Sequence, residues 1–130
     1  MYLQLRKHSW LLLLAALVLY GPTAVELARG LWQDDRHSHG PVLVALACWL
    51  FWNRLKEAPA KPLEQPMPLC GWSCVLVGLL LYVIGRSQAF PLFEVLSAVP
   101  LTIGVALLTG GRLLVRHLAF CHFFLLFLVP

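Results

Sequence analysis

The first side chains that could do chemistry are two histidines in a polar segment between apolar stretches. His37 and His39 alternate along the chain, so both imidazole rings lie on one side of an extended segment. Imidazole is the commonest protein ligand of transition metals. Two ligands do not close a metal site, however, and one of the nearby aspartates would have to fold back to complete it. We therefore expect no metal and no cofactor, and we expect His39, Gly40 and Pro41 to form the turn that enters the next apolar stretch.

A cysteine and two histidines near the end of the chain suggest a nucleophile with its base. Cys121 and His117 are one helical turn apart on one face, whereas the adjacent His122 lies about 100° around the helix. Cys121 lies about nine residues from the predicted inner boundary of its apolar stretch, which places it near the middle of a bilayer roughly 30 Å thick. A thiolate at that depth is poorly stabilised and far from any peptide substrate. We therefore predict that Cys121 is not catalytic.

The remaining cysteines also lie in or beside apolar runs: Cys48, Cys70 and Cys74. No two cysteines have the CxxC spacing of a metal or redox motif. We interpret all four cysteines of the chain as small, polarizable packing residues.

Arg86 and Glu94 lie on either side of a short predicted turn. Their positions predict an ion pair just outside the hydrocarbon, and Glu94 also falls in the first turn of a helix, where the helix dipole favours an acidic side chain. We expect a structural role, but charged groups at membrane depth are costly, so a functional role stays open.

The composition identifies the environment in which these residues must work. Of the 130 residues, 60% are hydrophobic and 12% are charged, against roughly 45–50% and about 25% in soluble domains. A chain this short cannot bury so much apolar surface in its own core. The excess must face lipid, which excludes a soluble enzyme, a nucleic-acid-binding module and a disordered tail.

The apolar stretches predict an all-α, polytopic transmembrane bundle. A spanning helix needs about 20 mostly apolar residues, and five such stretches nearly fill the chain: residues 9–28, 41–55, 69–85, 90–109 and 113–130. Gly21 and Pro22 are expected to kink the first span and Pro100 the fourth. A proline-rich link (57–68) joins the second span to the third, and short links at 86–89 and 110–112 join the later ones.

Lysine and arginine residues set the predicted orientation. Seven of them lie at the N-terminus and in the second and fourth connections, including Arg112 and Arg116, which we expect at lipid headgroups. Three lie in the first and third connections. Because positive residues favour the cytoplasm, the N-terminus is predicted inside. His39, Arg86 and Glu94 then gather at the outer face, where Pro130 also emerges.

Several short motifs, in their order and spacing, resemble the exosortase family. They are His39-Gly40 entering an apolar span, Gly85-Arg86-Ser87-Gln88 followed by Leu92-Phe93-Glu94-Val95, the later Pro100, Gly111-Arg112 with Arg116, and the terminal Phe123 to Pro130. The resemblance covers about residues 20–130, and the Gly-Arg-Ser-Gln and Leu-Phe-Glu pairing is most similar to the exosortase B subgroup. One departure is Phe120-Cys121-His122 where the family usually has Phe-Pro-Leu, which places a polar group in the last span.

The resemblance implies a multi-pass protein of the bacterial inner membrane that acts as a cysteine transpeptidase. Its partners would be exported proteins with a C-terminal Pro-Glu-Pro sorting signal, often in bacteria that make exopolysaccharide. The family's catalytic Cys, Arg and His lie in later spans and cannot be carried over onto any residue here. We therefore expect an N-terminal half that is inactive alone and is completed by a missing C-terminal half.

In this interpretation His39, Gly40, Arg86 and Glu94 have structural or substrate-positioning roles at the outer face. The alternative is a small non-enzymatic membrane scaffold or assembly subunit for export. A transporter is not favoured, because no inverted repeat and no charged residue deep within a span is evident.

Overall fold

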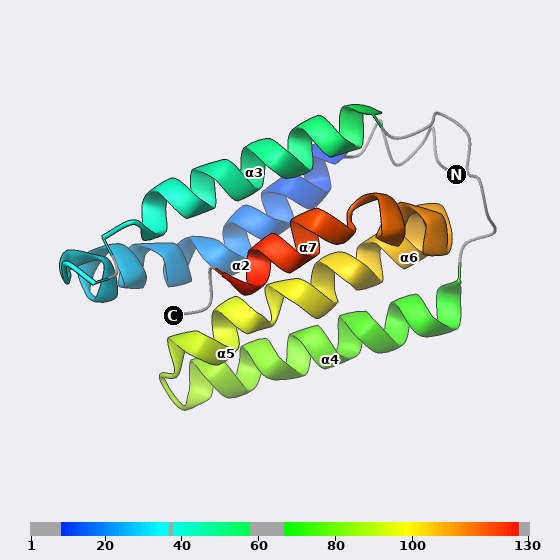
Figure 1. Cartoon of the computed structure of the whole chain (residues 1–130). Helices are drawn as coiled ribbons and strands as arrows, with labels where there is room; N and C mark the ends of the chain where they lie inside the picture. Colours follow the sequence, from blue (N-terminus) through cyan, green and yellow to red (C-terminus); the bar gives the residue numbers. More distant parts are fainter. Residues whose placement is uncertain (1–8, 37, 58–66, 128–130) are drawn as a thin grey trace.

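The computed structural model describes residues 9–36, 38–57 and 67–127, and these residues form helices and connecting turns (Figure 1). Four features of the sequence analysis lie outside the described residues: the basic pair Arg6-Lys7, His37, most of the proline-rich link (58–66) and the end of the chain (128–130).

The helices follow the predicted apolar stretches closely in the first half of the chain. They are α2 (Ser9–Arg29), the short 3₁₀ helix η1 (Leu31–Gln33), α3 (Gly40–Glu57) and α4 (Pro68–Ser87). Helices α5 (Pro91–Leu96), α6 (Ala98–His117) and α7 (Ala119–Leu126) follow. Successive long helices run in alternating directions along one axis, and α7 lies between α3 and α6 (Figure 1).

Prolines begin several of these helices because their fixed φ angle suits the first helical turn and their missing N–H is not needed there. Pro68 is the first residue of α4, Pro91 is the first residue of α5, and Pro41 is the second residue of α3.

Pro100 divides the fourth predicted span without ending it. Since proline has no N–H, the regular helical hydrogen bonding is interrupted near Ser97, which separates α5 from α6. Ser97 keeps helical angles (φ −60°, ψ −25°) and its N–H donates to the Phe93 carbonyl. Helices α5 and α6 therefore form a nearly continuous rod.

The last predicted stretch, 113–130, differs from a single uninterrupted helix. The turn expected at residues 110–112 is present, because Gly111 adopts φ 69° and ψ −161°, a backbone conformation that suits glycine. The following residues, however, form a short segment up to His117, and α7 begins only after Leu118 (φ −92°, ψ 6°). Apolar periodicity alone did not reveal this second break.

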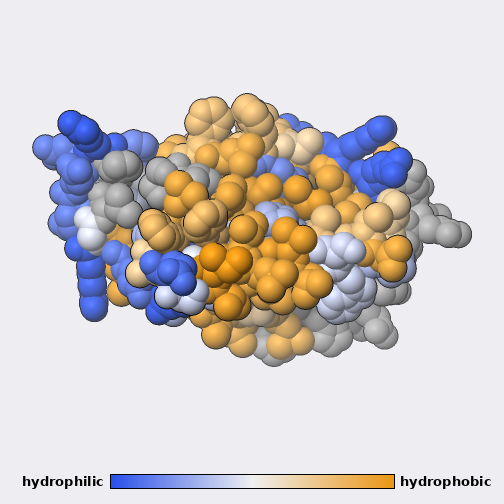
Figure 2. All heavy atoms as spheres, turned by 90° about the horizontal axis from the view of Figure 1, so that it is seen from below, coloured by the Kyte–Doolittle hydropathy of each residue, from blue (hydrophilic) through white to orange (hydrophobic). Residues whose placement is uncertain are grey.

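The surface has the pattern of a membrane protein. Strongly hydrophilic residues gather toward the two ends of the bundle and hydrophobic residues cover the middle (Figure 2). Among the described residues, two helical stretches are long and apolar enough to cross a membrane, Pro68–Ser87 and Pro91–Leu108. The lipid-facing character of α4 is clear from its exposed side chains, among them Leu69 and Trp72. That all five stretches cross the membrane remains a prediction.

Helices α4 and α6 approach closely because glycines face each other between them. A Cβ atom added to Gly104 would lie 2.8 Å from the carbonyl oxygen of Gly71, and one added to Gly71 would lie 2.7 Å from Cγ of Leu108.

A separate hydrophobic core joins α6 and α7 to α3. Its buried residues are Ala106, Leu114, Leu118 and Cys121, and Leu50, Phe51 and Val115 pack against them.

Candidate functional site

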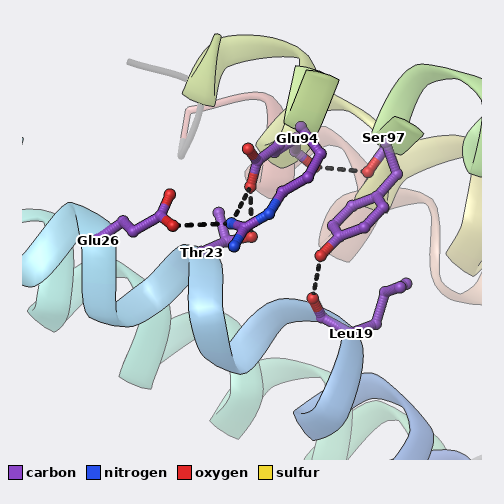
Figure 3. Close-up of polar contacts among 7 residues, drawn as sticks. Leu19, Thr23, Glu26, Glu94 and Ser97 are labelled. Atoms are coloured by element: carbon purple, nitrogen blue, oxygen red, sulfur yellow. Dashed lines mark hydrogen bonds and ion pairs between the residues drawn. The ribbon is translucent and has the colours of Figure 1, made fainter. Parts of the chain in front are cut away.

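Arg86, at the end of α4, connects three helices at one end of the bundle (Figure 3). Its Nη1 lies 2.9 Å from Oε1 of Glu26 in α2 and 3.8 Å from Oε2 of Glu94 in α5. The ion pair expected between Arg86 and Glu94 is therefore present. Glu26 is a second carboxylate partner that the sequence analysis did not identify.

Glu94 is enclosed by the protein. Its side chain is 3% exposed, although charged side chains are seldom buried unless they are paired. The Thr23 hydroxyl donates a hydrogen bond of 2.5 Å to Glu94 Oε2, and Thr23 is itself buried. The hydrogen bond from the hydroxyl and the nearby guanidinium offset much of the free energy that this carboxylate loses when it leaves water.

The turn between α4 and α5 places Glu94 against glycine. The Phe90 N–H donates to the Gly85 carbonyl at 2.9 Å, and Ala89 adopts φ 54° to close the turn. A Cβ atom on Gly85 would lie 2.7 Å from the backbone nitrogen of Glu94 and 2.9 Å from its Cγ. The absence of a side chain at Gly85 therefore allows α5 to pack directly onto α4.

Hydroxyl groups extend the site from Glu94 toward the interior of the bundle. The Ser97 hydroxyl donates to the Glu94 carbonyl at 2.5 Å, so its single proton is engaged. The Tyr20 hydroxyl lies 2.7 Å from Ser97 Oγ and must act as the donor. Tyr82 stands edge-on to Tyr20. Its hydroxyl donates to the Leu19 carbonyl (Figure 3).

We name these residues together the Arg86 network: Tyr20, Thr23, Glu26, Arg86, Glu94 and Ser97. Its two carboxylates and single guanidinium carry a formal net charge of −1. The Arg86 and Glu26 side chains are 42% and 59% exposed, so the network extends from a buried carboxylate to the surface. No described cysteine or histidine forms a hydrogen bond with it. The arrangement suits holding helices together and orienting a polar segment at this end of the bundle, not nucleophilic attack.

His39 and Gly40 lie apart from the Arg86 network. His39 is exposed, and its carbonyl accepts the Leu43 N–H at the start of α3. The Trp32 indole packs directly over Gly40, where any Cβ atom would collide with it. These contacts agree with the expected turn into the second apolar stretch. Within the described part of the chain, neither residue forms a hydrogen bond or an ion pair with Arg86 or Glu94.

The cysteines and histidines near the end of the chain do not form a nucleophile with its base. Cys121 is 1% exposed in the core between α3, α6 and α7. His117 Nε2 is engaged with the Arg54 carbonyl at 2.9 Å. His122 is buried with no hydrogen-bond partner at either ring nitrogen and stands edge-on to Phe51. Over the described residues, no group of three or more potential metal ligands is found.

Part of the Arg86 network could have been predicted from the sequence. Tyr20, Thr23 and Glu26 recur at three-residue intervals in an otherwise apolar stretch, a spacing that keeps side chains near one helix face. Their partners could not be predicted from the sequence, because they lie far away in the chain (|i−j| = 77 for Tyr20 and Ser97, 71 for Thr23 and Glu94). Only helix packing brings them together.

A family model described as transmembrane exosortase matches residues 31–130 of the chain. No curated protein and no solved structure matches.

Proposed function

The chain belongs to the transmembrane exosortase family, and from this premise we propose that it forms part of a membrane transpeptidase that sorts exported proteins. The match over residues 31–130 is the observation that carries the proposal. The proposed substrates carry a C-terminal Pro-Glu-Pro signal. The proposed enzyme is of the B type, lies in the bacterial inner membrane and is linked to exopolysaccharide production.

In this proposal the described helices are a scaffold and do not supply the nucleophile. The burial of Cys121 and its position in an apolar core support this assignment. A thiol acts as a nucleophile in its thiolate form, which needs a nearby positive charge or base and access for the substrate. Cys121 is therefore proposed not to be the attacking cysteine.

We also propose that five stretches cross the membrane, with the N-terminus in the cytoplasm and the Arg86 network at the outer face. The distribution of Lys and Arg between the connections and the alternating directions of the long helices support this orientation. An exported substrate would then meet the bundle at the end where Arg86 and Glu26 are exposed.

At that end the Arg86 network is proposed to position adjoining helices or the sorting peptide. The buried Glu94 fixes Arg86 between α2 and α5, and the exposed part of the guanidinium retains donors for a peptide carbonyl or carboxylate. His39 and Gly40 are proposed to act in the same way at the start of α3.

The proposal is tested by following a secreted reporter that carries a Pro-Glu-Pro signal in the host that encodes this chain. Deleting the gene should leave the reporter in its longer, unprocessed form, and restoring the wild-type chain should restore cleavage. A Cys121→Ser chain at equal abundance should restore cleavage too. Normal processing after deletion would overturn the proposal and leave the non-enzymatic scaffold as the better interpretation.

His39 is tested in the same strain. His39→Ala should slow reporter processing while the amount of protein in the membrane stays the same. If both processing and protein level are unchanged, the role proposed for His39 is wrong.

A further inference from the structure

The end of the bundle opposite the Arg86 network carries a basic surface contributed by two helices. We name it the basic patch: Arg54 and Lys56 from α3, and Arg112 and Arg116 from α6. The His117 ring, in the last turn of α6, lies 2.9 Å from the Arg54 carbonyl, in the last turn of α3. This contact places the two helix ends side by side, so the four cations share one end of the molecule.

The break at Gly111 orients the second half of the basic patch. After it, Leu114 and Leu118 turn inward to the core, where they are 9% and 4% exposed. Arg112 and Arg116, one helical turn apart, are exposed on the other side of this segment. The short segment therefore presents two guanidinium groups to the surroundings.

The basic patch is poorly neutralised by the protein. Among the described residues its only ion pair joins Arg54 to Glu57 at 4.0 Å, where both side chains are substantially exposed. At the other end of the bundle, by contrast, the Arg86 guanidinium has two carboxylates near it. Four cations close to one carboxylate attract an anion.

Tryptophans set the depth of the basic patch in the membrane. Trp49 and Trp52 lie one helical turn apart on α3, just before Arg54, and are 59% and 53% exposed. Exposed indoles favour the headgroup level of a bilayer. Lys56 Nζ lies 5.2 Å from the centre of the Trp52 ring, so the cations stand at the same level as the tryptophans or just beyond it.

We propose that the basic patch binds the phosphate of anionic phospholipids, such as phosphatidylglycerol, in preference to zwitterionic lipids. Guanidinium groups match phosphate oxygens in geometry and charge, and basic surfaces between transmembrane helices on the cytoplasmic side are suited to anionic headgroups. The proposed occupant is a lipid and not free phosphate, because the exposed indoles beside the cations favour the headgroup level of a bilayer.

The test is native mass spectrometry of the full chain in detergent, titrated with phosphatidylglycerol or with phosphatidylcholine of the same acyl chains. Wild type should bind phosphatidylglycerol at least tenfold more tightly. Each cation near an anionic surface contributes about fivefold. Arg112→Gln with Arg116→Gln should therefore lower this preference by up to about 25-fold, to no less than the phosphatidylcholine level. Inorganic phosphate at millimolar concentration should not compete.

The matched control removes two arginines from the other end, Arg29→Gln with Arg36→Gln, and should leave the preference unchanged. If the first pair lowers helix content, Lys56→Gln with Arg116→Gln replaces it. Equal binding of both lipids by wild type, an unchanged preference in the patch variants, an equal loss in the control, or competition by free phosphate would each overturn the proposal.

Discussion

Removal of the Arg86 guanidinium tests the electrostatic interpretation of the Arg86 network. In an Arg86→Gln variant the Glu94 carboxylate stays 3% exposed and keeps Thr23 as a hydrogen-bond donor, but it loses its nearest cation. Loss of one partner from a buried pair costs about 3–5 kcal/mol, whereas exposed pairs contribute roughly 0–1 kcal/mol. Since Arg86 is 42% exposed, we expect the free energy of unfolding to fall by about 2 kcal/mol.

A double-mutant cycle with Glu94→Gln separates this effect from general damage. Glutamine keeps an oxygen that accepts the Thr23 hydroxyl, so the single variant should lose about 1 kcal/mol. In the double variant no uncompensated charge remains, and the loss should be smaller than the sum of the single losses by at least about 1 kcal/mol.

The assay is unfolding in mixed micelles with an increasing fraction of sodium dodecyl sulfate, followed by far-ultraviolet circular dichroism. Arg112→Gln, in the basic patch, is the control and should change stability by less than about 0.5 kcal/mol. Additive losses around the cycle, or an Arg86→Gln loss no larger than that of the control, would refute the reasoning.

Three further predictions use the same unfolding assay. Gly85→Ala should destabilise the chain by about 1–3 kcal/mol, because its Cβ would lie 2.7 Å from the backbone nitrogen of Glu94. Gly21→Ala is the control: nothing lies within 4 Å of its Cβ, so it should be neutral or stabilise by up to about 1 kcal/mol. Equal effects of the two variants would contradict the close approach at Gly85. His122→Leu should stabilise the chain by about 1 kcal/mol, since the buried ring has the backbone of Leu118 and Thr102 nearby but no hydrogen bond of normal geometry at either nitrogen. A clear loss of stability would contradict this. Tyr20→Phe should cost about 1 kcal/mol through the lost hydrogen bond to Ser97, and an unchanged stability would remove Tyr20 from the network.

Much of the helical architecture could be predicted from the sequence. Apolar length placed α2, α3 and α4 within two residues of their observed ends, and Pro41 marked the start of α3. Residues 110–112 were predicted as a short link, and the break at Gly111 falls within it. The break at Leu118 was missed, since it is flanked by residues that suit a continuous helix and depends on how the segment packs against α3.

The candidate site was predicted only where its partners are close in the chain. Arg86 and Glu94 are separated by one short turn, so their pairing followed from local geometry. Glu26 pairs with Arg86 and Thr23 bonds Glu94 through the packing of α2 against α5, which no local pattern specifies. His39 was grouped with Arg86 and Glu94 from the predicted membrane side alone, and sharing a side does not imply contact.

The most direct test of the proposed role of the Arg86 network is reporter processing by the Arg86→Gln, Glu94→Gln double variant. This variant removes both charges and should be no less stable than Arg86→Gln, so processing is compared with wild type at matched abundance in the membrane. We predict that the Pro-Glu-Pro reporter accumulates in its unprocessed form even at matched abundance. Processing at the wild-type rate would contradict a positioning role and leave the network with a structural function only.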